Sequence, residues 1–387
     1  MTGQAVETTP TRPVNPTTIA EVEELIGPKL PPGAEEFSTD YSLHSVPYNE
    51  ILSGGPPKDG IPSIDEPKFI AVKEADEWLR PLEPVIQIKL GDIARAYPMQ
   101  ILVWHEIVND WAGETPLLVT FCPLCNTAIV FERRVNGEAV TFGTTGKLRF
   151  SNLIMYDRQT ESWWQQATGE AIAGELTGTR LERVPALIVA WQDFREAFPE
   201  GRVLSRDTGY PRYFERYGLN PYQGYDDINS SPFLFSGPPS PAAMPPMARV
   251  LTLDLNGEAV AFPYETLKVI GVANEDVGGR PFAIFWQPGV ASALDAAIIA
   301  EGKDVGTAAA FSRFLDGQTL DFVFLGGLIL DEQTGSTWDI FGKAVAGSLK
   351  GSQLEPVVSI NHFWFSWAAF KPETRIYVPS PEGVNDF

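Results

Sequence analysis

The sequence has very little cysteine. Its two cysteines, Cys122 and Cys125, are separated by only two residues. A pair this close cannot close a long loop, so the chain lacks the disulfide framework that holds small secreted domains together. The pair is expected to be a set of metal ligands, a redox dithiol or a pair of structural thiols.

Basic residues are also scarce: 29 Lys and Arg stand against 50 Asp and Glu, which gives a formal net charge of -21. Such an excess repels phosphate backbones and anionic lipid headgroups, so we expect no nucleic-acid binding. No apolar run approaches the roughly 20 residues that a helix needs to span a bilayer, so we expect no transmembrane segment.

Several targeting and catalytic motifs are missing as well. The N-terminus, MTGQAVETTPTRPVNPTT, lacks the basic start and apolar core of a signal peptide, which predicts a cytoplasmic protein or the mature form of an exported one. The chain contains no G-x-S-x-G, no phosphate-binding glycine loop and no paired histidine motif. Common serine hydrolases and nucleotide enzymes are therefore disfavoured, and whether the protein is an enzyme is left open.

The residues that are abundant indicate a β-rich protein. Hydrophobic residues make up 44% of the 387 positions, and 34 Gly and 33 Pro favour many turns and short strands over long helices. The expected fold class is α+β, mainly antiparallel β. The length exceeds the roughly 250–300 residues at which one hydrophobic core usually stops growing, so two core-forming units are expected.

Composition divides the chain into four parts. Residues 1–66 are rich in Pro, Gly, Thr and Ser and are predicted to form an extended N-terminal arm. Residues 67–235 form a first lobe, and 236–248, which include SGPPSPAAMPP, form a Pro-rich linker. Residues 249–387 form a second, degenerate lobe.

The two lobes resemble each other in sequence. VIQIKLGDIARAYP (85–98) aligns with VLTLDLNGEAVAFP (250–263), and each begins like a β-hairpin. Farther along, DRQTESWWQQATGEAIAG (157–174) matches DEQTGSTWDIFGKAVAG (331–347). Because the matches keep their order, they predict two pseudo-equivalent lobes that arose by an internal duplication.

The first lobe has two predicted helices and a strand pair around the cysteines. ILVWHEIVND (101–110) is expected to be helical, with His105 and Val108 on one face, and a second helix is expected over 190–198. TPLLVTF and NTAIVFERR flank the cysteines as strands, and an Asn-Gly turn follows at 136–137.

The duplication separates structural from functional candidates, because features present in both lobes are expected to serve the shared fold. The polar groups of the first lobe that are missing from the second are His105, Cys122 and Cys125. At the aligned positions the second lobe has Ile270, Trp286 and Gly289.

These three side chains suit a metal site. Cys-x-x-Cys between two strands is the geometry of a metal knuckle, and His105 on the preceding helix is predicted to lie over the turn. Two thiolates and one imidazole favour zinc or copper, so one transition-metal ion is the expected cofactor. The fourth position would be open to water or substrate, or filled by one of three candidate donors: Met99, Met155 and His362.

Two other functions are compatible with the same residues. A thiol-disulfide oxidoreductase would use Cys122 as the attacking sulfur and Cys125 as the resolving one, although a pair between strands lacks the helix N-terminus that lowers a thiol pKa. A binding or scaffold protein without chemistry would leave the cysteines as buried structural thiols. The reaction, if any, and the partner are not specified by the sequence.

Two further polar segments are assigned to structure. The residues Asp157, Gln159, Thr160 and Ser162 have the counterparts Asp331, Gln333, Thr334 and Ser336, so a turn that caps a hairpin is the expected role. The segment 205–227 has no counterpart. We expect it to wrap the first lobe rather than line a pocket.

Several motifs also carry a family resemblance. At WHEIVND (104–110), TFCPLCNTAIVFER (120–133), YDRQTESWWQ, GEAIAG, VLSRDTGY and NPYQGY, the sequence resembles the bacterial family catalogued as domain of unknown function 3179. The resemblance runs over nearly the whole chain beyond residue 66. It implies a shared fold, draws attention to the His105, Cys122 and Cys125 set, suggests export, and implies no activity.

Overall fold

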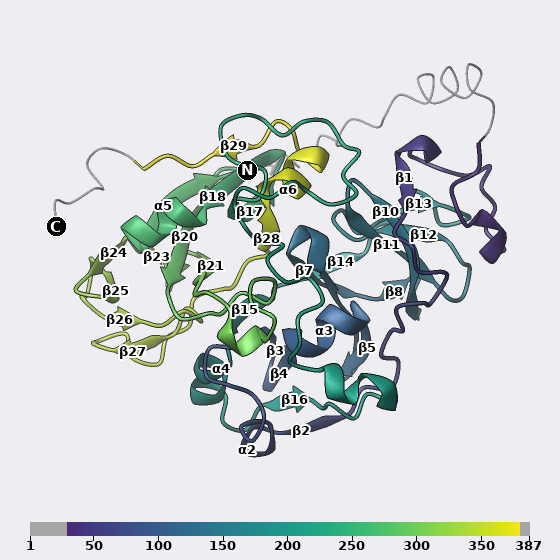
Figure 1. Cartoon of the computed structure of the whole chain (residues 1–387). Coiled ribbons are helices and arrows are strands. Elements are labelled where there is room, and N and C mark those ends of the chain that lie inside the picture. Colours follow the sequence, from purple (N-terminus) through teal and green to yellow (C-terminus); the bar gives the residue numbers. More distant parts are fainter. Residues whose placement is uncertain (1–28, 380–387) are drawn as a thin grey trace.

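The structure is a computed structural model that describes residues 29–379, and antiparallel β-sheets make up most of it (Figure 1). This confirms the expected α+β class, mainly antiparallel β. Within the described range, no helix is both long and apolar enough to cross a bilayer. Part of the arm predicted over residues 1–66 lies outside the described residues.

The elements from β3 to β16 are here called the first series. It opens with β3 (Pro84–Leu90), β4 (Ile93–Pro98), α3 (Met99–His105), β5 (Ile107–Ala112) and β6 (Thr115–Cys122). It continues with β7 (Thr127–Glu132), β8 (Arg134–Val135), β9 (Glu138–Ala139), β10 (Phe142–Arg149), β11 (Asn152–Asp157), β12 (Trp163–Gln165), β13 (Glu170–Ala173), β14 (Glu182–Val184), β15 (Leu187–Ala190), α4 (Trp191–Ala197) and β16 (Arg202–Leu204).

The elements from β17 to β29 are called the second series. It opens with β17 (Arg249–Leu255), β18 (Glu258–Pro263), α5 (Tyr264–Ile270), β19 (Val272–Val277) and β20 (Arg280–Gln287). It continues with β21 (Thr307–Ser312), β22 (Phe314–Leu315), β23 (Gln318–Thr319), β24 (Phe322–Leu325), β25 (Leu328–Asp331), β26 (Thr337–Trp338), β27 (Ala344–Ala346), β28 (Ile360–Phe363), α6 (Trp364–Phe370) and β29 (Arg375–Ile376).

The sheets of the two series have the same strand order. The first contains the order β15-β3-β4-β16, and the second contains β28-β17-β18-β29. In both, the last strand joins its neighbour in parallel, whereas the other pairs are antiparallel. The first five elements of each series also have the same lengths in the same order.

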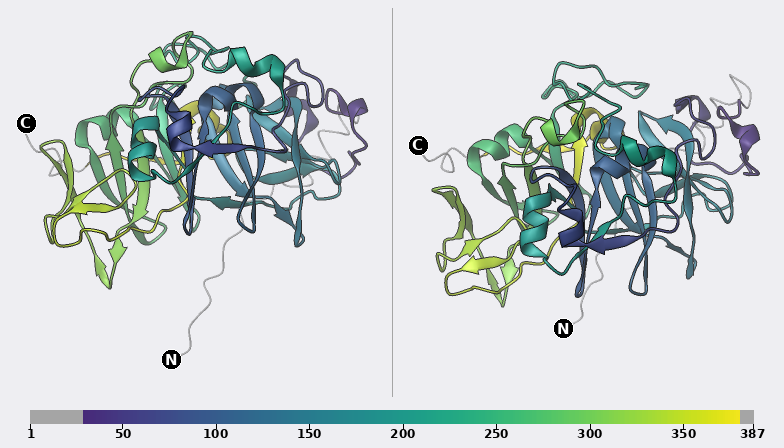
Figure 2. Two further views of the ribbon diagram at one scale, coloured as in Figure 1. Left: turned by 90° about the horizontal axis from the view of Figure 1, so that it is seen from below. Right: turned by 60° about the horizontal axis from the view of Figure 1, so that its bottom comes forward.

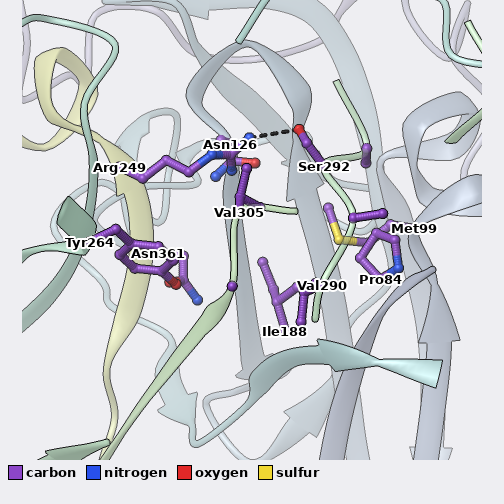
Figure 3. Close-up of a pocket in the computed structure, with 13 residues that line it drawn as sticks. Pro84, Met99, Asn126, Ile188, Arg249, Tyr264, Val290, Ser292, Val305 and Asn361 are labelled. Carbon is purple, nitrogen blue, oxygen red and sulfur yellow. Dashed lines mark hydrogen bonds between the residues drawn. The ribbon is translucent and has the colours of Figure 1, made fainter. Parts of the chain in front are cut away.

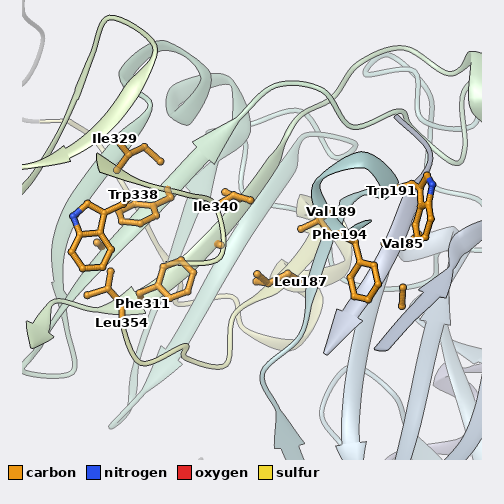
Figure 4. Packing of buried hydrophobic residues seen from close by; sticks show 14 of the residues in the cluster. Val85, Leu187, Val189, Trp191, Phe194, Phe311, Ile329, Trp338, Ile340 and Leu354 are labelled. Carbon is orange, nitrogen blue, oxygen red and sulfur yellow. The ribbon is translucent and has the colours of Figure 1, made fainter. Parts of the chain in front are cut away.

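A shared hydrophobic core joins the two series. Trp191 and Phe194 of the first series belong to the same buried cluster as Phe311 and Trp338 of the second (Figure 4). Burying a side chain of this size contributes about 1.5–3 kcal/mol. The series lie side by side in both views of Figure 2, and because they share this core, neither is expected to be stable alone.

The residues between 29 and 75 pack against the first series. They form η1 (Ala34–Glu36), η2 (Tyr48–Glu50), β1 (Ile51–Ser53), β2 (Phe69–Ala71) and α2 (Val72–Ala75). β1 pairs with β10, and the ring of Phe37 packs edge-on against Trp163. The described part of the predicted arm therefore adds a strand to one sheet and an aromatic ring to the core beside it.

One predicted helix is found, one residue shorter at each end than expected, and the other ends early. The helix expected over 190–198 is α4. The helix expected over 101–110 ends at His105, because Glu106 takes a positive φ of 59° and the β-branched residues that follow pair with β6 as strand β5. Val108 therefore lies on a strand and shares no helix face with His105.

The two matched Asp motifs form the same turn. Asp157 accepts hydrogen bonds from the backbone N–H of Thr160 at 2.7 Å and from the indole of Trp164 at 2.9 Å. Asp331 accepts the equivalent bonds from Thr334 at 2.6 Å and Trp338 at 2.9 Å. Both carboxylates are buried, so these residues hold hairpins in place, the role expected from the presence of the motif in both matched segments.

We predict that Asp157→Ala and Asp331→Ala each lower the free energy of unfolding by about 2–4 kcal/mol, because each leaves a buried indole N–H without an acceptor. Urea denaturation followed by fluorescence measures the loss. Glu332→Ala, an exposed neighbour, serves as the control and should change stability by less than about 0.5 kcal/mol. Equal stability of the Asp331 variant and this control would contradict the structural role.

Candidate functional site

The two cysteines lie on the tight turn between β6 and β7. β6 ends at Cys122, the chain forms a 3-10 turn over Pro123–Cys125 (η3), and Asn126 takes a positive φ of 50° before β7 begins at Thr127. Pro fixes the φ that opens such a turn, and Asn tolerates the left-handed conformation that closes it. The spacing therefore places both sulfurs on one short turn, as predicted.

Both thiols converge on a single carbonyl group. The cysteines are free and buried, and the Cys122 and Cys125 S–H groups donate to the carbonyl oxygen of Ser151 at 3.6 and 3.3 Å. The side-chain amide of Asn152 donates to the Cys125 sulfur at 3.5 Å. The two thiols are also close enough to interact directly with each other.

The hairpin that presents this carbonyl has a strained turn. Phe150 and Ser151, between β10 and β11, have φ values of 54° and 62°. Glycine or asparagine usually fills both central positions of such a turn, and other residues cost about 1–2 kcal/mol each there. The hairpin β24–β25 of the second series is shorter and has Gly326 and Gly327 at its turn. Of these two hairpins, only the one that reaches the cysteines has non-glycine residues in this conformation.

Glu106 occupies another position that favours glycine. It ends α3 with a φ of 59°, and Gly271 ends α5 with a φ of 69°. The two carbonyls accept equivalent hydrogen bonds of 2.8 Å from the N–H groups of Phe121 and Trp286. This pairing shifts the sequence alignment by one residue, so that Gln287, and not Trp286, is the counterpart of Cys122.

The side chain of Glu106 is buried without a partner. Among residues 29–379 its carboxyl group has no hydrogen-bond or ion-pair partner, and burial raises its pKa to about 8. Burial also raises the pKa of the Cys122 thiol well above its ordinary value, and the nearby Cys125 and Glu106 add to this rise. At neutral pH the carboxyl and the thiol are therefore both mainly protonated.

Part of the segment between β16 and β17 covers the cysteine turn. The hydroxyl of Tyr225 donates to the carbonyl of Leu124 at 3.0 Å and accepts from the N–H of Phe233 at 3.2 Å. Tyr222 lies close enough to Glu106 and Cys122 for their charges to raise its pKa, after the larger effect of burial. The segment therefore separates the cysteines from solvent.

His105 lies in a different environment from the cysteines. Its Nδ1–H donates to the carbonyl of Pro62 at 2.7 Å, so its Nε2 accepts from the hydroxyl of Tyr217 at 2.7 Å. The rings of Tyr210 and Tyr213 pack beside the imidazole, and burial lowers its pKa to about 4. His105 is thus neutral, with both nitrogens engaged, and it is covered by the segment expected to wrap the first lobe.

The structure therefore does not bring His105 together with Cys122 and Cys125 as metal ligands. The described residues contain no group of three or more His, Cys, Asp or Glu side chains that could hold a metal ion. The physical reason is that α3 ends at His105 and both imidazole nitrogens are engaged there, by the Pro62 carbonyl and the Tyr217 hydroxyl. Sequence reasoning did not identify Glu106. The glycine at the aligned position, Gly271, could have indicated that the backbone is left-handed there.

The candidates for a fourth ligand are dispersed. His362 hydrogen-bonds through Nδ1 to Thr127 at 2.9 Å, has no partner within residues 29–379 for its buried Nε2, and has a pKa lowered to about 3 by burial. Met155 packs in the same apolar cluster as both cysteines, and Met99 lines a separate small cavity. None of them completes the predicted set.

That cavity lies between the two series, beside the cysteine turn. Asn126 borders it, and Arg249, Tyr264 and Asn361 line it from the second series (Figure 3). Its free volume of about 20 Å³ is enough for roughly one water molecule. Residues 288–306, which connect β20 to β21 where the first series has the cysteine turn, supply much of its wall.

Fold and site together define a mainly antiparallel β-sheet protein with a buried Cys-x-x-Cys dithiol. The chain belongs to the family described as Protein of unknown function (DUF3179), which matches residues 58–374. This confirms the resemblance found in the motifs around Trp104 and Cys122. No curated protein and no solved structure matches the chain.

We predict that Glu106→Gln removes part of the pH dependence of stability. Because the pKa of Glu106 is raised to about 8 in the folded protein, its contribution is fully present below its unfolded value and is lost as the pH rises through 8. Relative to the Gln variant, the wild type should lose about 3–5 kcal/mol between pH 4 and pH 9. Denaturant midpoints at both pH values measure this, and parallel changes in the two proteins would contradict it.

We also predict that Tyr225→Phe exposes the cysteines. Loss of the hydroxyl removes the bonds to Leu124 and Phe233, so reaction with a maleimide should accelerate about fivefold to tenfold. Tyr222→Phe is the matched control, because the Tyr222 hydroxyl forms no hydrogen bond with residues 29–379. Equal acceleration in both variants would show that the Tyr225 bonds do not hold the cover.

Proposed function

We propose that this protein is a thiol-disulfide oxidoreductase in which Cys122 and Cys125 alternate between a dithiol and an internal disulfide. The observation that carries the proposal is the convergence of both S–H groups on the carbonyl of Ser151. Donors that share one acceptor atom must lie near each other. The metal site expected from the sequence would lack its third ligand, because both nitrogens of His105 are engaged elsewhere.

The turn geometry favours an internal bond. Residues at the two ends of a four-residue turn have Cα atoms less than about 7 Å apart. A disulfide needs a Cα separation of about 4.4–6.8 Å. Cys122 and Cys125 occupy the two ends of the turn, so their sulfurs need little backbone movement to bond.

The reaction transfers two electrons to a low-molecular-weight disulfide. The Cys122 thiolate attacks one sulfur of the substrate, forms a mixed disulfide and releases the first product thiol. Cys125 then attacks the Cys122 sulfur, which closes the internal disulfide and releases the second thiol. The two thiol protons of the protein end on the two products. Because both cysteines are buried, a small substrate is favoured over a folded protein.

The surroundings of the sulfurs favour the reduced form. Closing the disulfide eliminates both S–H donors, so the Ser151 carbonyl loses the two bonds it accepts from them. A protein that stabilises its dithiol makes its disulfide a stronger oxidant. The same steps therefore run more readily in reverse, in which the internal disulfide and two substrate thiols give the dithiol and a substrate disulfide.

We propose further that the two series are products of an internal duplication, with 67–235 as the active lobe and 249–387 as a framework. The shared strand order, the two Asp turns and the equivalent bonds at Glu106 and Gly271 support this. In the second lobe the loop 288–306 stands in place of the cysteine turn. The second lobe would then act by supporting the first through their common core.

The redox proposal predicts that mild oxidation removes two titratable thiols and lowers the mass by two hydrogens without forming dimers. Thiol titration and intact-mass measurement over a glutathione redox series give the midpoint potential. Cys122→Ser and Cys125→Ser should each abolish the internal disulfide.

Three results would contradict the proposal. Stoichiometric zinc or copper in protein purified without added metal, lost in both serine variants, would restore the metal function. If the thiols stay reduced at every glutathione ratio, a binding or scaffold role is the remaining function. Oxidation that yields only dimers would show that the two sulfurs cannot reach each other.

A further inference from the structure

We propose that Asn152 is a catalytic residue of this centre, whose side-chain amide stabilises negative charge on the Cys125 sulfur when the internal disulfide closes or opens. This inference rests on the proposed redox function. The contact that carries it is the hydrogen bond of 3.5 Å from Asn152 Nδ2 to Cys125 Sγ. Asn152 is the first residue of β11, directly after the Ser151 carbonyl that accepts from both thiols.

The backbone fixes the orientation of the Asn152 amide. The N–H of Ala167 donates to Asn152 Oδ1 at 2.9 Å, and Gln165 Nε2 donates to the same oxygen at 2.6 Å. Because a backbone N–H can only donate, the atom that faces Ala167 must be the amide oxygen. The amide nitrogen of Asn152 is therefore the atom that faces the Cys125 sulfur.

A second amide leaves one N–H of Asn152 for the sulfur. Asn152 Nδ2 donates to Gln166 Oε1 at 2.7 Å. Gln166 is oriented by the backbone as well, because its Nε2 donates to the Thr127 carbonyl at 3.1 Å and a carbonyl can only accept. An amide nitrogen has two hydrogens, so the one that Gln166 does not use is free for Cys125. Both amides are fully buried, so water does not compete for them.

The Cys125 sulfur needs such a donor. Cys125 has no exposed surface, so water cannot solvate a charge on its sulfur. The Ser151 carbonyl accepts the S–H bond of the dithiol, but it has no hydrogen to offer a thiolate. A buried charge is costly unless it is hydrogen-bonded, and hydrogen bonds to charged groups are stronger than neutral ones. The bond from Asn152 therefore strengthens as the sulfur becomes negative.

The charge can be followed through the closing step. Once Cys122 has formed the mixed disulfide, the Cys125 thiol gives up its proton and its sulfur attacks Cys122 Sγ. The bond between Cys122 and the substrate sulfur breaks, and the substrate leaves with the electron pair and takes up one proton. In reverse, a substrate thiolate attacks Cys122 Sγ and Cys125 leaves as the thiolate. Asn152 donates to the same sulfur in both directions.

The second series lacks this pair of amides as well as the cysteines. The equivalent Asp turns, each with a tryptophan seven residues after the aspartate, match the two series position by position. By this match, Asn152 and Gln166 correspond to Gly326 and Ile340. The buried amides are therefore present only where there are sulfurs to serve.

The test follows a single oxidation of the reduced full-length protein by 2-hydroxyethyl disulfide, with acid quenching and intact-mass measurement to separate the mixed disulfide from the internal one. Asn152→Ala should slow the closing step about 10-fold to 100-fold, so that the mixed disulfide accumulates. In a Cys125→Ser background only the attack by Cys122 remains. There Asn152→Ala should leave the rate of mixed-disulfide formation unchanged.

Asn109→Ala is the matched control. Asn109 is a buried asparagine of β5 that accepts from the N–H of Phe142 at 2.9 Å and donates to its carbonyl at 2.8 Å. Asn274 forms the same pair of bonds with Phe322 in the second series, so this amide serves the fold. Asn109→Ala should lower the melting temperature and leave the closing step at the wild-type rate.

Asn152→Asp provides the same test if the Ala variant does not fold. It keeps an oxygen for the Ala167 N–H and for Gln165, but a carboxylate has no N–H for the sulfur. The closing step should slow at least as much as in Asn152→Ala, because the carboxylate also repels the thiolate.

The two proposals fail in different ways. If the wild type forms no Cys122–Cys125 disulfide, the redox function itself is wrong. If the disulfide forms and the folded Asn152 variant closes it at the wild-type rate, the redox function stands and the role of Asn152 falls. Equal slowing of the Cys122 step and the closing step would also overturn that role, because it would indicate a general structural effect.

Discussion

Burial of the turn that carries Cys122 and Cys125 is the constraint on which the rest of the site depends. Because water does not reach the sulfurs, the protein must provide the acceptor for both S–H groups, and the Ser151 carbonyl does so. Desolvation raises the pKa of the Cys122 thiol well above its ordinary value, so this sulfur is protonated at neutral pH.

The site is built from residues that the backbone would not otherwise prefer. Glu106, Phe150 and Ser151 all have positive φ values, and none is glycine; Glu161, in the turn after Asp157, has the same conformation away from the cysteines. Such conformations persist only where the surrounding structure enforces them, and they concentrate at functional sites. The second series supplies an internal reference, because it has Gly271 at the position of Glu106 and Gly326 at the turn of its shorter hairpin.

The sequence predicted the parts of the fold that depend on local chemistry. The matched hairpins, the turns at Asp157 and Asp331 and the placement of the cysteines between two strands follow from turn residues and alternation. The helix boundary at His105 did not, because it depends on a positive φ at a glutamate, and propensity assigns that conformation to glycine or asparagine. The same boundary leaves both imidazole nitrogens of His105 engaged away from the cysteines.

The cysteines are bordered by two kinds of structure. On one side are the hydrogen-bonded strands β6, β7, β10 and β11, which fix the sulfurs and their shared acceptor. On the other side is the segment between β16 and β17, whose only regular element in the described residues is the short 3-10 helix η4 (Pro211–Arg216). Segments with few backbone bonds open at a lower free energy than strands. If the proposed redox function holds, a substrate would reach the sulfurs by movement of the cover, while the strands hold the two cysteines in place.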